Sequence, residues 1–174
     1  MSARYSVSLL DNLSIAEWSN YLAVQAEVAA TLTGLVFVAV SINLSRVLSV
    51  PGVSGRAAES LMQLFSVVIV SSNMLVPGEP DGIRAAWLLV AGAALWLAQT
   101  TIQIRYARSK TGHPKFWLFT RVAQTQVTSV PFCVAGVLLF YGSPAGMQWL
   151  SRGFTFSLVS GVLSAWVLLV EILR

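Results

Sequence analysis

The sequence has few charged residues for its length. Only 10% of its 174 residues are Asp, Glu, Lys or Arg, whereas a soluble domain has about 25%. Hydrophobic residues make up 56% of the chain, and the mean hydropathy is +0.72. So little polar side chain cannot cover a surface that faces water. The composition therefore predicts a protein whose solvent is largely lipid.

Cysteine and histidine are each present once. Cys133 lies in an apolar run and has no partner for an intramolecular disulfide. One cysteine and one histidine cannot form a metal constellation. The sequence also contains no Gly-rich phosphate loop and no Ser/His/Asp set. We therefore expect no metal, no cofactor, no catalytic residue and no enzymatic activity.

Long apolar runs are abundant. A helix needs roughly 20 apolar residues to cross a bilayer, and five runs approach that length, at residues 21–44, 58–77, 84–104, 120–142 and 149–173. Pro- and Gly-rich turn segments separate several of them, namely SVPGVSG, VPGEPDG and GSPAG. The predicted fold is an all-α integral membrane bundle of five transmembrane helices, formed by residues 21–174.

Residues 1–20 are expected to be an extracytoplasmic segment with a short interfacial helix. Ser14 and Glu17 have the spacing of a capping box, which predicts the start of the first helix at Ser14. Trp18 and Tyr21 follow where an aromatic belt is expected at a membrane surface. Asp11 and Glu17 do not fit a cleavable signal peptide, and no lipidation motif is present.

The distribution of basic residues predicts the orientation. With five crossings, eight of the eleven Lys and Arg residues fall on one side of the membrane: Arg46, Arg56, Arg105, Arg108, Lys110, Lys115, Arg121 and Arg174. The positive-inside rule places that side in the cytoplasm, with the N-terminus outside. The net charge of +4 is dispersed between apolar runs, which does not favour nucleic acid as a partner.

Glu27 is a carboxylate within the first apolar run, and such groups usually face a bundle interior or water. Helical spacing puts it on one small, polar face with Thr31, Gly34, Val38, Ser41 and Ser45. We expect this face to pack against protein or to line a cavity. Glu27 then binds an ion or a proton, or it is a structural residue that bonds a neighbouring helix or reaches the headgroups.

Two amide- and hydroxyl-rich clusters lie near the predicted cytoplasmic side. One ends the third run with Gln99, Thr100, Thr101 and Gln103, and the other begins the fourth with Gln124, Thr125, Gln126, Thr128 and Ser129. Antiparallel neighbours bring the clusters to similar depth. They form either a hydrated vestibule or interhelical hydrogen bonds, and the same choice applies to Asn43 and Asn73.

Packing signals occur in the fourth and fifth runs. Pro131 removes a backbone hydrogen bond and is expected to kink its helix near Val127, with Thr128 compensating. The fifth run has small residues at four-residue steps, which predict close helix packing within the chain or between subunits: Gly153, Ser157, Gly161 and Ala165. Ala30 and Gly34 in the first run offer a shorter version of this spacing. Glu59 and Glu171 are expected to form interfacial ion pairs with Arg56 and Arg174.

Residues 31–61 carry a resemblance to a known group. Leu32, Thr33 and Gly34 open an apolar helix, Asn43 and Leu44 close it, Pro51 marks a turn, and Arg56, Ala57 and Glu59 open the next helix. This pattern resembles small bacterial multi-pass membrane proteins, some of them labelled modulators of the membrane protease FtsH. The resemblance implies a bacterial cytoplasmic membrane protein and supplies no site residues.

Two functions remain open from the sequence. The first is a non-enzymatic accessory or regulatory protein, acting through helix–helix association with other membrane proteins or with itself. The alternative is a homo-oligomeric ion channel or small transporter that uses Glu27 and pore-lining hydroxyl and amide residues. Either function makes the lipid bilayer a partner of the chain.

Overall fold

The computed structural model describes residues 2–49, 53–109 and 115–173. Of residues 2–16, 106, 109, 115–121, 168, 169 and 171–173, only the course of the backbone is described. The described chain is helical apart from short turns, and its elements are α1 (Ser2–Ile42), α2 (Leu44–Ser49), α3 (Val53–Met74), α4 (Asp81–Ser109), α5 (Lys115–Phe140) and α6 (Ala145–Leu173).

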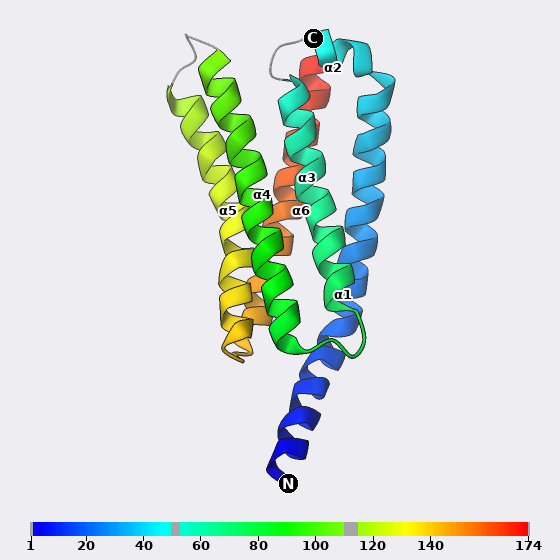
Figure 1. The fold of residues 1–174 in the computed structure, drawn as a ribbon. Helices are drawn as coiled ribbons and strands as arrows, with labels where there is room; N and C mark the ends of the chain where they lie inside the picture. Colours follow the sequence, from blue (N-terminus) through cyan, green and yellow to red (C-terminus); the bar gives the residue numbers. More distant parts are fainter. Residues whose placement is uncertain (1, 50–52, 110–114, 174) are drawn as a thin grey trace.

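The five long helices run alternately up and down in one bundle (Figure 1). The short helix α2 and the end of α6 lie at one end. The turns that join α3 to α4 and α5 to α6 lie at the other, and α1 projects beyond the bundle there. The chain is therefore an all-α helical bundle, as the composition predicts.

Four helical stretches of the described residues are long and apolar enough to cross a membrane: Glu17–Ile42, Val53–Met74, Asp81–Arg105 and Val122–Phe140. The outside of the bundle is also apolar. Phe37, Ile42, Phe140 and Trp166 are each more than 60% exposed, and so extensive an apolar surface is unusual for a protein surrounded by water. These observations identify a membrane protein.

The helices are longer than the apolar runs. α1 begins at Ser2, so the expected start at Ser14 is wrong. No Gly or Pro interrupts the chain before Gly34, and Ser, Asp and Asn cost a helix interior less than about 1 kcal/mol each. α3, α4 and α5 likewise start before the runs predicted for them. Polarity marks where a helix leaves lipid, whereas a cap, Gly or Pro determines where it ends.

The turn between α5 and α6 is a helix cap that requires glycine. Gly142 has φ +70°, a left-handed conformation that costs other residues energy. The N–H of Ser143 donates to the carbonyl of Leu138, and the N–H of Gly142 donates to the carbonyl of Leu139, both at 2.9 Å. This pattern is a Schellman motif, and Pro144 follows it. It reverses the chain tightly, so α5 and α6 pack as neighbours.

The core of the bundle has an apolar half next to the two turns. Its buried side chains come from all five long helices: Leu22, Ala29, Val67, Val70, Met74, Leu88, Leu95, Phe132, Ala135, Met147, Leu150 and Phe154. α1 joins this half through aromatic contacts, because the ring of Tyr21 stacks on Phe154 at 6.5 Å and meets Trp18 edge-on at 5.5 Å. Each of the other four helices has polar buried residues further from the turns.

Candidate functional site

The other half of the core is polar, and we call it the polar half. Its side chains come from α3, α4, α5 and α6, and each is less than 9% exposed: Glu59, Ser60, Gln63, Gln99, Gln103, Thr125, Thr128, Ser129, Ser157 and Ser160. It lies between the apolar half and the end of the bundle that holds α2. Buried polar groups are costly unless they are hydrogen-bonded, so their partners decide what this region can do.

Ser160 is the centre of one hydrogen-bonded group. Its hydroxyl donates to Oε1 of Gln63 at 2.9 Å and accepts from Nε2 of Gln124. Nε2 of Gln124 also donates to the hydroxyl of Ser164 at 3.1 Å. These bonds connect α3, α6 and α5 across the interior of the bundle. Ser60 adds a second link between α3 and α6, since its hydroxyl donates to the carbonyl of Gly161 at 2.8 Å.

The two predicted amide clusters do meet across α4 and α5. Nε2 of Gln103 donates to the hydroxyl of Thr125, and Nε1 of Trp96 donates to Oε1 of Gln126 at 3.2 Å. Antiparallel packing brings these positions to one depth, as expected. Thr128 behaves differently from the expectation at Pro131. Its hydroxyl donates to the carbonyl of Thr125 at 3.0 Å, not to the carbonyl of Val127, which Pro131 leaves without a helical donor.

Besides Oε1 of Glu59, whose side chain takes part in another interaction, three members of the polar half have atoms without a hydrogen-bond partner among the described residues. They are Gln99, with both amide atoms, and Ser129 and Ser157, with their hydroxyls. Each residue is 1% exposed or less. Most buried polar groups in proteins are paired, so this concentration of unpaired atoms is the most unusual chemical feature of the core.

The small residues of α6 pack inside the chain's own bundle. A Cβ at Gly153 would lie 3.3 Å from Cβ of Pro131, and one at Gly161 would lie 2.8 Å from the side chain of Leu64. Ser157 and Ala165, in the same row, are also buried. The close approach that the spacing predicts is therefore intramolecular, with α5 at one end of the row and α3 at the other.

The Glu27 face lies on the outside of the bundle. Glu27, Thr31, Gly34, Val38 and Ser41 are all exposed, opposite the buried Leu22 and Ala29. No atom of the described residues lies within 4 Å of a Cβ placed at Gly34. Among the described residues of one copy, this face has no protein packed against it, because α1 turns its other side toward α3 and α6. Close packing at Gly34 against a second chain stays a prediction.

The hydroxyls on this face bond their own helix. Thr31 Oγ1 donates to the carbonyl of Glu27 at 2.9 Å, and Ser41 Oγ donates to the carbonyl of Phe37 at 2.8 Å. Asn43 does the same with the carbonyl of Ala39, at 2.9 Å. Bonds of this kind leave a hydroxyl or amide with little need of an external partner. Glu27 is thus the one strongly polar group that this stretch of α1 presents to its surroundings.

The remaining polar predictions have mixed outcomes. Glu59 is 7% exposed, because α3 begins at Val53 and carries it into the bundle. Glu59 and Arg56 each take part in a polar or electrostatic interaction, and the ion pair between them stays a prediction. The side chain of Glu171 lies outside the described ones. Asn73 is half-buried near the end of α3, and its Oδ1 has no hydrogen-bond partner among the described residues.

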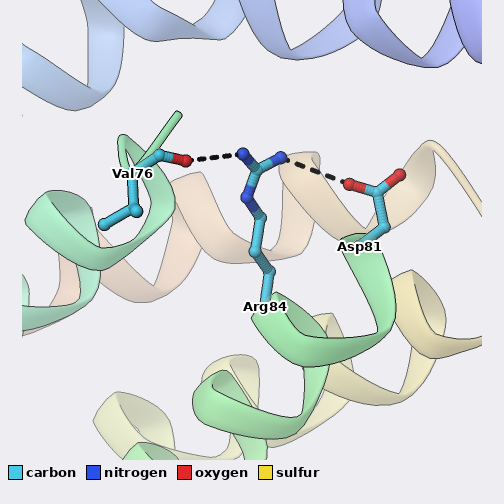
Figure 2. A network of polar contacts seen from close by, with 3 residues as sticks. All are labelled: Val76, Asp81 and Arg84. Atoms are coloured by element: carbon cyan, nitrogen blue, oxygen red, sulfur yellow. Dashed lines mark hydrogen bonds and ion pairs between the residues drawn. The ribbon is translucent and has the colours of Figure 1, made fainter. Parts of the chain in front are cut away.

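A separate polar network fastens the turn between α3 and α4 (Figure 2). Arg84 reaches back from the first turns of α4, and one guanidinium nitrogen donates to the carbonyl of Val76 at 2.8 Å. The other terminal nitrogen lies 3.3 Å from Oδ1 of Asp81. Arg84 is 8% exposed. It satisfies a carbonyl beyond the end of α3 and holds the start of α4 beside it, which is a structural role.

Ser60, Gln63 and Ser160 are members of the polar half that the sequence did not single out. The feature of the sequence that could have identified them is their helical spacing. Ser60 and Gln63 are one helical turn apart on α3, and Ser157, Ser160 and Ser164 recur at three- and four-residue steps on α6. Each set forms one face of its helix. Without knowledge of which helices are neighbours, such a face cannot be told from a packing surface.

The fold and the site define a helical-bundle membrane protein with a half-polar core. Among the residues that the structure describes, no group of His, Cys, Asp and Glu could hold a metal ion. Comparison of the chain with protein-family models, with curated proteins and with solved structures gives no match. The function has to be inferred from the chain's own residues.

Proposed function

We propose that the protein is a non-enzymatic accessory or regulatory protein of a bacterial cytoplasmic membrane, which acts by associating through α1 with other membrane proteins. The observation behind this proposal is the outward position of Glu27 and Gly34. In the apolar 18-residue stretch of α1, 6% of the residues are buried, whereas 28% to 44% are buried in the corresponding stretches of the other three candidate spans. Among these four candidate spans, α1 is thus the one with most surface left to contact a partner.

Glu27 supports a partner with a hydrogen-bond donor at the same depth. A carboxylate that faces lipid is costly, so such residues usually face protein or water. Gly34 and Ala30 are small and exposed, and small residues let a second helix backbone approach closely. A polar or basic side chain on that helix would then reach Glu27.

A two-fold pairing of α1 with α1 fits less well. An isologous contact puts the same patch of both subunits together, so two Glu27 carboxylates would face each other in a medium of low polarity. Like charges at short range destabilise each other. We therefore commit to a different membrane protein as the partner, and the resemblance of residues 31–61 to modulators of a membrane protease is compatible with that choice.

The orientation belongs to the same proposal. We propose five crossings, with α6 as the fifth, the N-terminus outside and the C-terminus in the cytoplasm. Support comes from α6 lying within the bundle beside α3 and α5 (Figure 1). The basic residues near α2, the end of α4 and the start of α5 are all at the end of the bundle proposed to be cytoplasmic.

Photocrosslinking in the native membrane, followed by mild solubilisation, tests the association. A photoreactive residue at Val38, on the Glu27 face, is expected to capture a membrane protein of a different sequence. The same residue at Leu35, which is 62% exposed on a neighbouring face, is the control. Gly34→Leu should abolish the captured product because it prevents close approach. A complex that contains only copies of this chain would contradict the proposal.

A homo-oligomeric channel or small transporter is the second candidate. The exposed row of Glu27, Thr31, Gly34 and Ser41 would line a pore if several copies turned this face toward a common axis. Ion flux through liposomes that contain the purified chain tests this function. Flux that responds to Glu27→Gln would favour the channel, whereas liposomes that stay tight with a solitary chain would remove it.

A further inference from the structure

We propose that the polar half holds a binding site for small uncharged molecules that both donate and accept hydrogen bonds, formed by Gln99, Ser129 and Ser157. This inference is independent of the association through α1. It concerns the interior of the bundle, whereas the proposed function concerns its outer face.

The first step is that the three residues lie at one depth. On α6, Gly153 faces Pro131 and Ser160 bonds Gln124, so Ser157 lies beside the turn of α5 near Val127. On α4, Trp96 bonds Gln126 and Gln103 bonds Thr125, which places Gln99 beside the same turn. Ser129 belongs to that turn. At 1.5 Å of rise per residue, the three positions lie within about 5 Å along the bundle axis.

The second step is the state of their polar atoms. Gln99 and Ser157 are 0% exposed and Ser129 is 1% exposed. Both amide atoms of Gln99 and both serine hydroxyls lack a hydrogen-bond partner among the described residues. Around them, Gln63, Gln103, Gln124 and Thr125 are engaged with one another or with Ser160. Apart from Oε1 of Glu59, whose side chain has another interaction, the unpaired atoms of the polar half thus belong to these three residues.

The third step is the chemistry of a complementary ligand. The amide of Gln99 offers one donor group and one acceptor, and each hydroxyl can do either. None of the three carries a formal charge. Glu59, the buried carboxylate on α3, already takes part in a polar or electrostatic interaction. The set therefore suits an uncharged molecule such as water, urea or glycerol more than an ion.

The apolar half of the core borders this site on one side. Phe132 and Phe154 are almost fully buried and their rings contact each other at 5.8 Å. They lie on the side of the site toward the α5–α6 turn. The apolar half therefore closes the site on the side toward that turn.

Cysteine modification of the full chain in lipid nanodiscs tests the site. Ser129→Cys and Ser157→Cys are made in a Cys133→Ala background and treated with a small aqueous methanethiosulfonate. Ser71→Cys is the matched control, since Ser71 is also 0% exposed with an unpaired hydroxyl but lies on α3 toward the apolar half. We expect the first two to react at least tenfold faster. Equal, slow rates at all three positions would overturn the proposal.

Competition distinguishes the ligands. Slower modification of Ser157→Cys in urea or glycerol identifies a small organic solute, and fast modification that neither solute slows identifies water. Protection by sodium or potassium chloride, but not by choline chloride, would contradict an uncharged ligand.

If the cysteine variants do not fold, the melting temperature of a different variant tests the proposal. A buried amide without a ligand destabilises the fold, so Gln99→Leu would then raise the melting temperature. If the amide binds water or a solute, the same substitution lowers it. A raised melting temperature in Gln99→Leu would overturn the proposal.

Discussion

Gly161 of α6 lies so close to Leu64 of α3 that a Cβ on the glycine would be 2.8 Å from the leucine side chain. Leu64 is 0% exposed, so its side chain is enclosed by protein. The carbonyl of Gly161 also accepts the hydroxyl of Ser60 at 2.8 Å. The two helices are held at this point by close approach and by a hydrogen bond together.

Gly161→Ala is therefore expected to destabilise the bundle by about 1–3 kcal/mol, because an added group in a filled core forces its neighbours to shift. Gly34→Ala is the matched control. No described atom lies within 4 Å of its Cβ position, and alanine is better than glycine in a helix by about 1 kcal/mol. Thermal unfolding in detergent should show a lower midpoint for the first variant and an equal or higher midpoint for the second.

Arg84 is expected to be more important for stability than the ion pair it makes. Arg84→Leu loses the bond to the carbonyl of Val76 and should cost about 1–3 kcal/mol, the usual range for hydrogen bonds to charged groups. Asp81→Asn should cost less than about 1 kcal/mol, because the side chain of Asp81 is 52% exposed and exposed ion pairs contribute little. Chemical unfolding measures both free energies. Equal losses in the two variants would show that the ion pair is the main contribution of Arg84 to stability.

Ser160 and Gln63 are expected to be energetically coupled. Ser160→Ala removes the donor to Oε1 of Gln63 and should destabilise the fold by about 1–3 kcal/mol through the groups left unpaired. In Gln63→Leu the acceptor is already absent, so the serine substitution should cost less. A double-mutant cycle measures the difference, expected near 0.6 kcal/mol and at most about 1.7 kcal/mol for a hydrogen bond between membrane helices. Strict additivity would mean that the bond adds nothing.

Reporter fusions are expected to reveal the orientation. A reporter that is active only in the cytoplasm should be active after Arg174 and inactive when fused before α1. A fusion in the turn between α3 and α4 should be inactive as well, since that turn lies at the end of the bundle opposite α2 (Figure 1). Activity in that turn would reverse the proposed orientation, and an inactive fusion after Arg174 would contradict the five crossings.

The sequence predicts some residues of the polar half but not all of them. Gln99, Gln103 and Gln124 stand out because amides are costly in apolar helices, and antiparallel order brings their helices to a common depth. Ser60 and Ser160 do not stand out, since a serine in a membrane helix can bond its own backbone. Only the neighbouring positions of α3 and α6 reveal that Ser160 bonds Gln63.

Glu27 shows the limit of the sequence most clearly. Its helical face with Thr31, Gly34 and Ser41 follows from spacing alone, and that grouping is right. Which side of α1 turns inward is decided by packing. Leu22, Ala29 and the ring of Tyr21 fit against α3 and α6, so the opposite face points outward.

The sequence by itself determined the helical class, the apolar surroundings and the positions of the turns, because these depend on local composition and on Pro and Gly. The tertiary structure decided which helices are neighbours, which polar groups are buried and which face of α1 remains open. Those properties depend on how side chains from distant segments fit together. Gly161 is an example: its small size is visible in the sequence, but the reason for it is Leu64, 97 residues earlier in the chain.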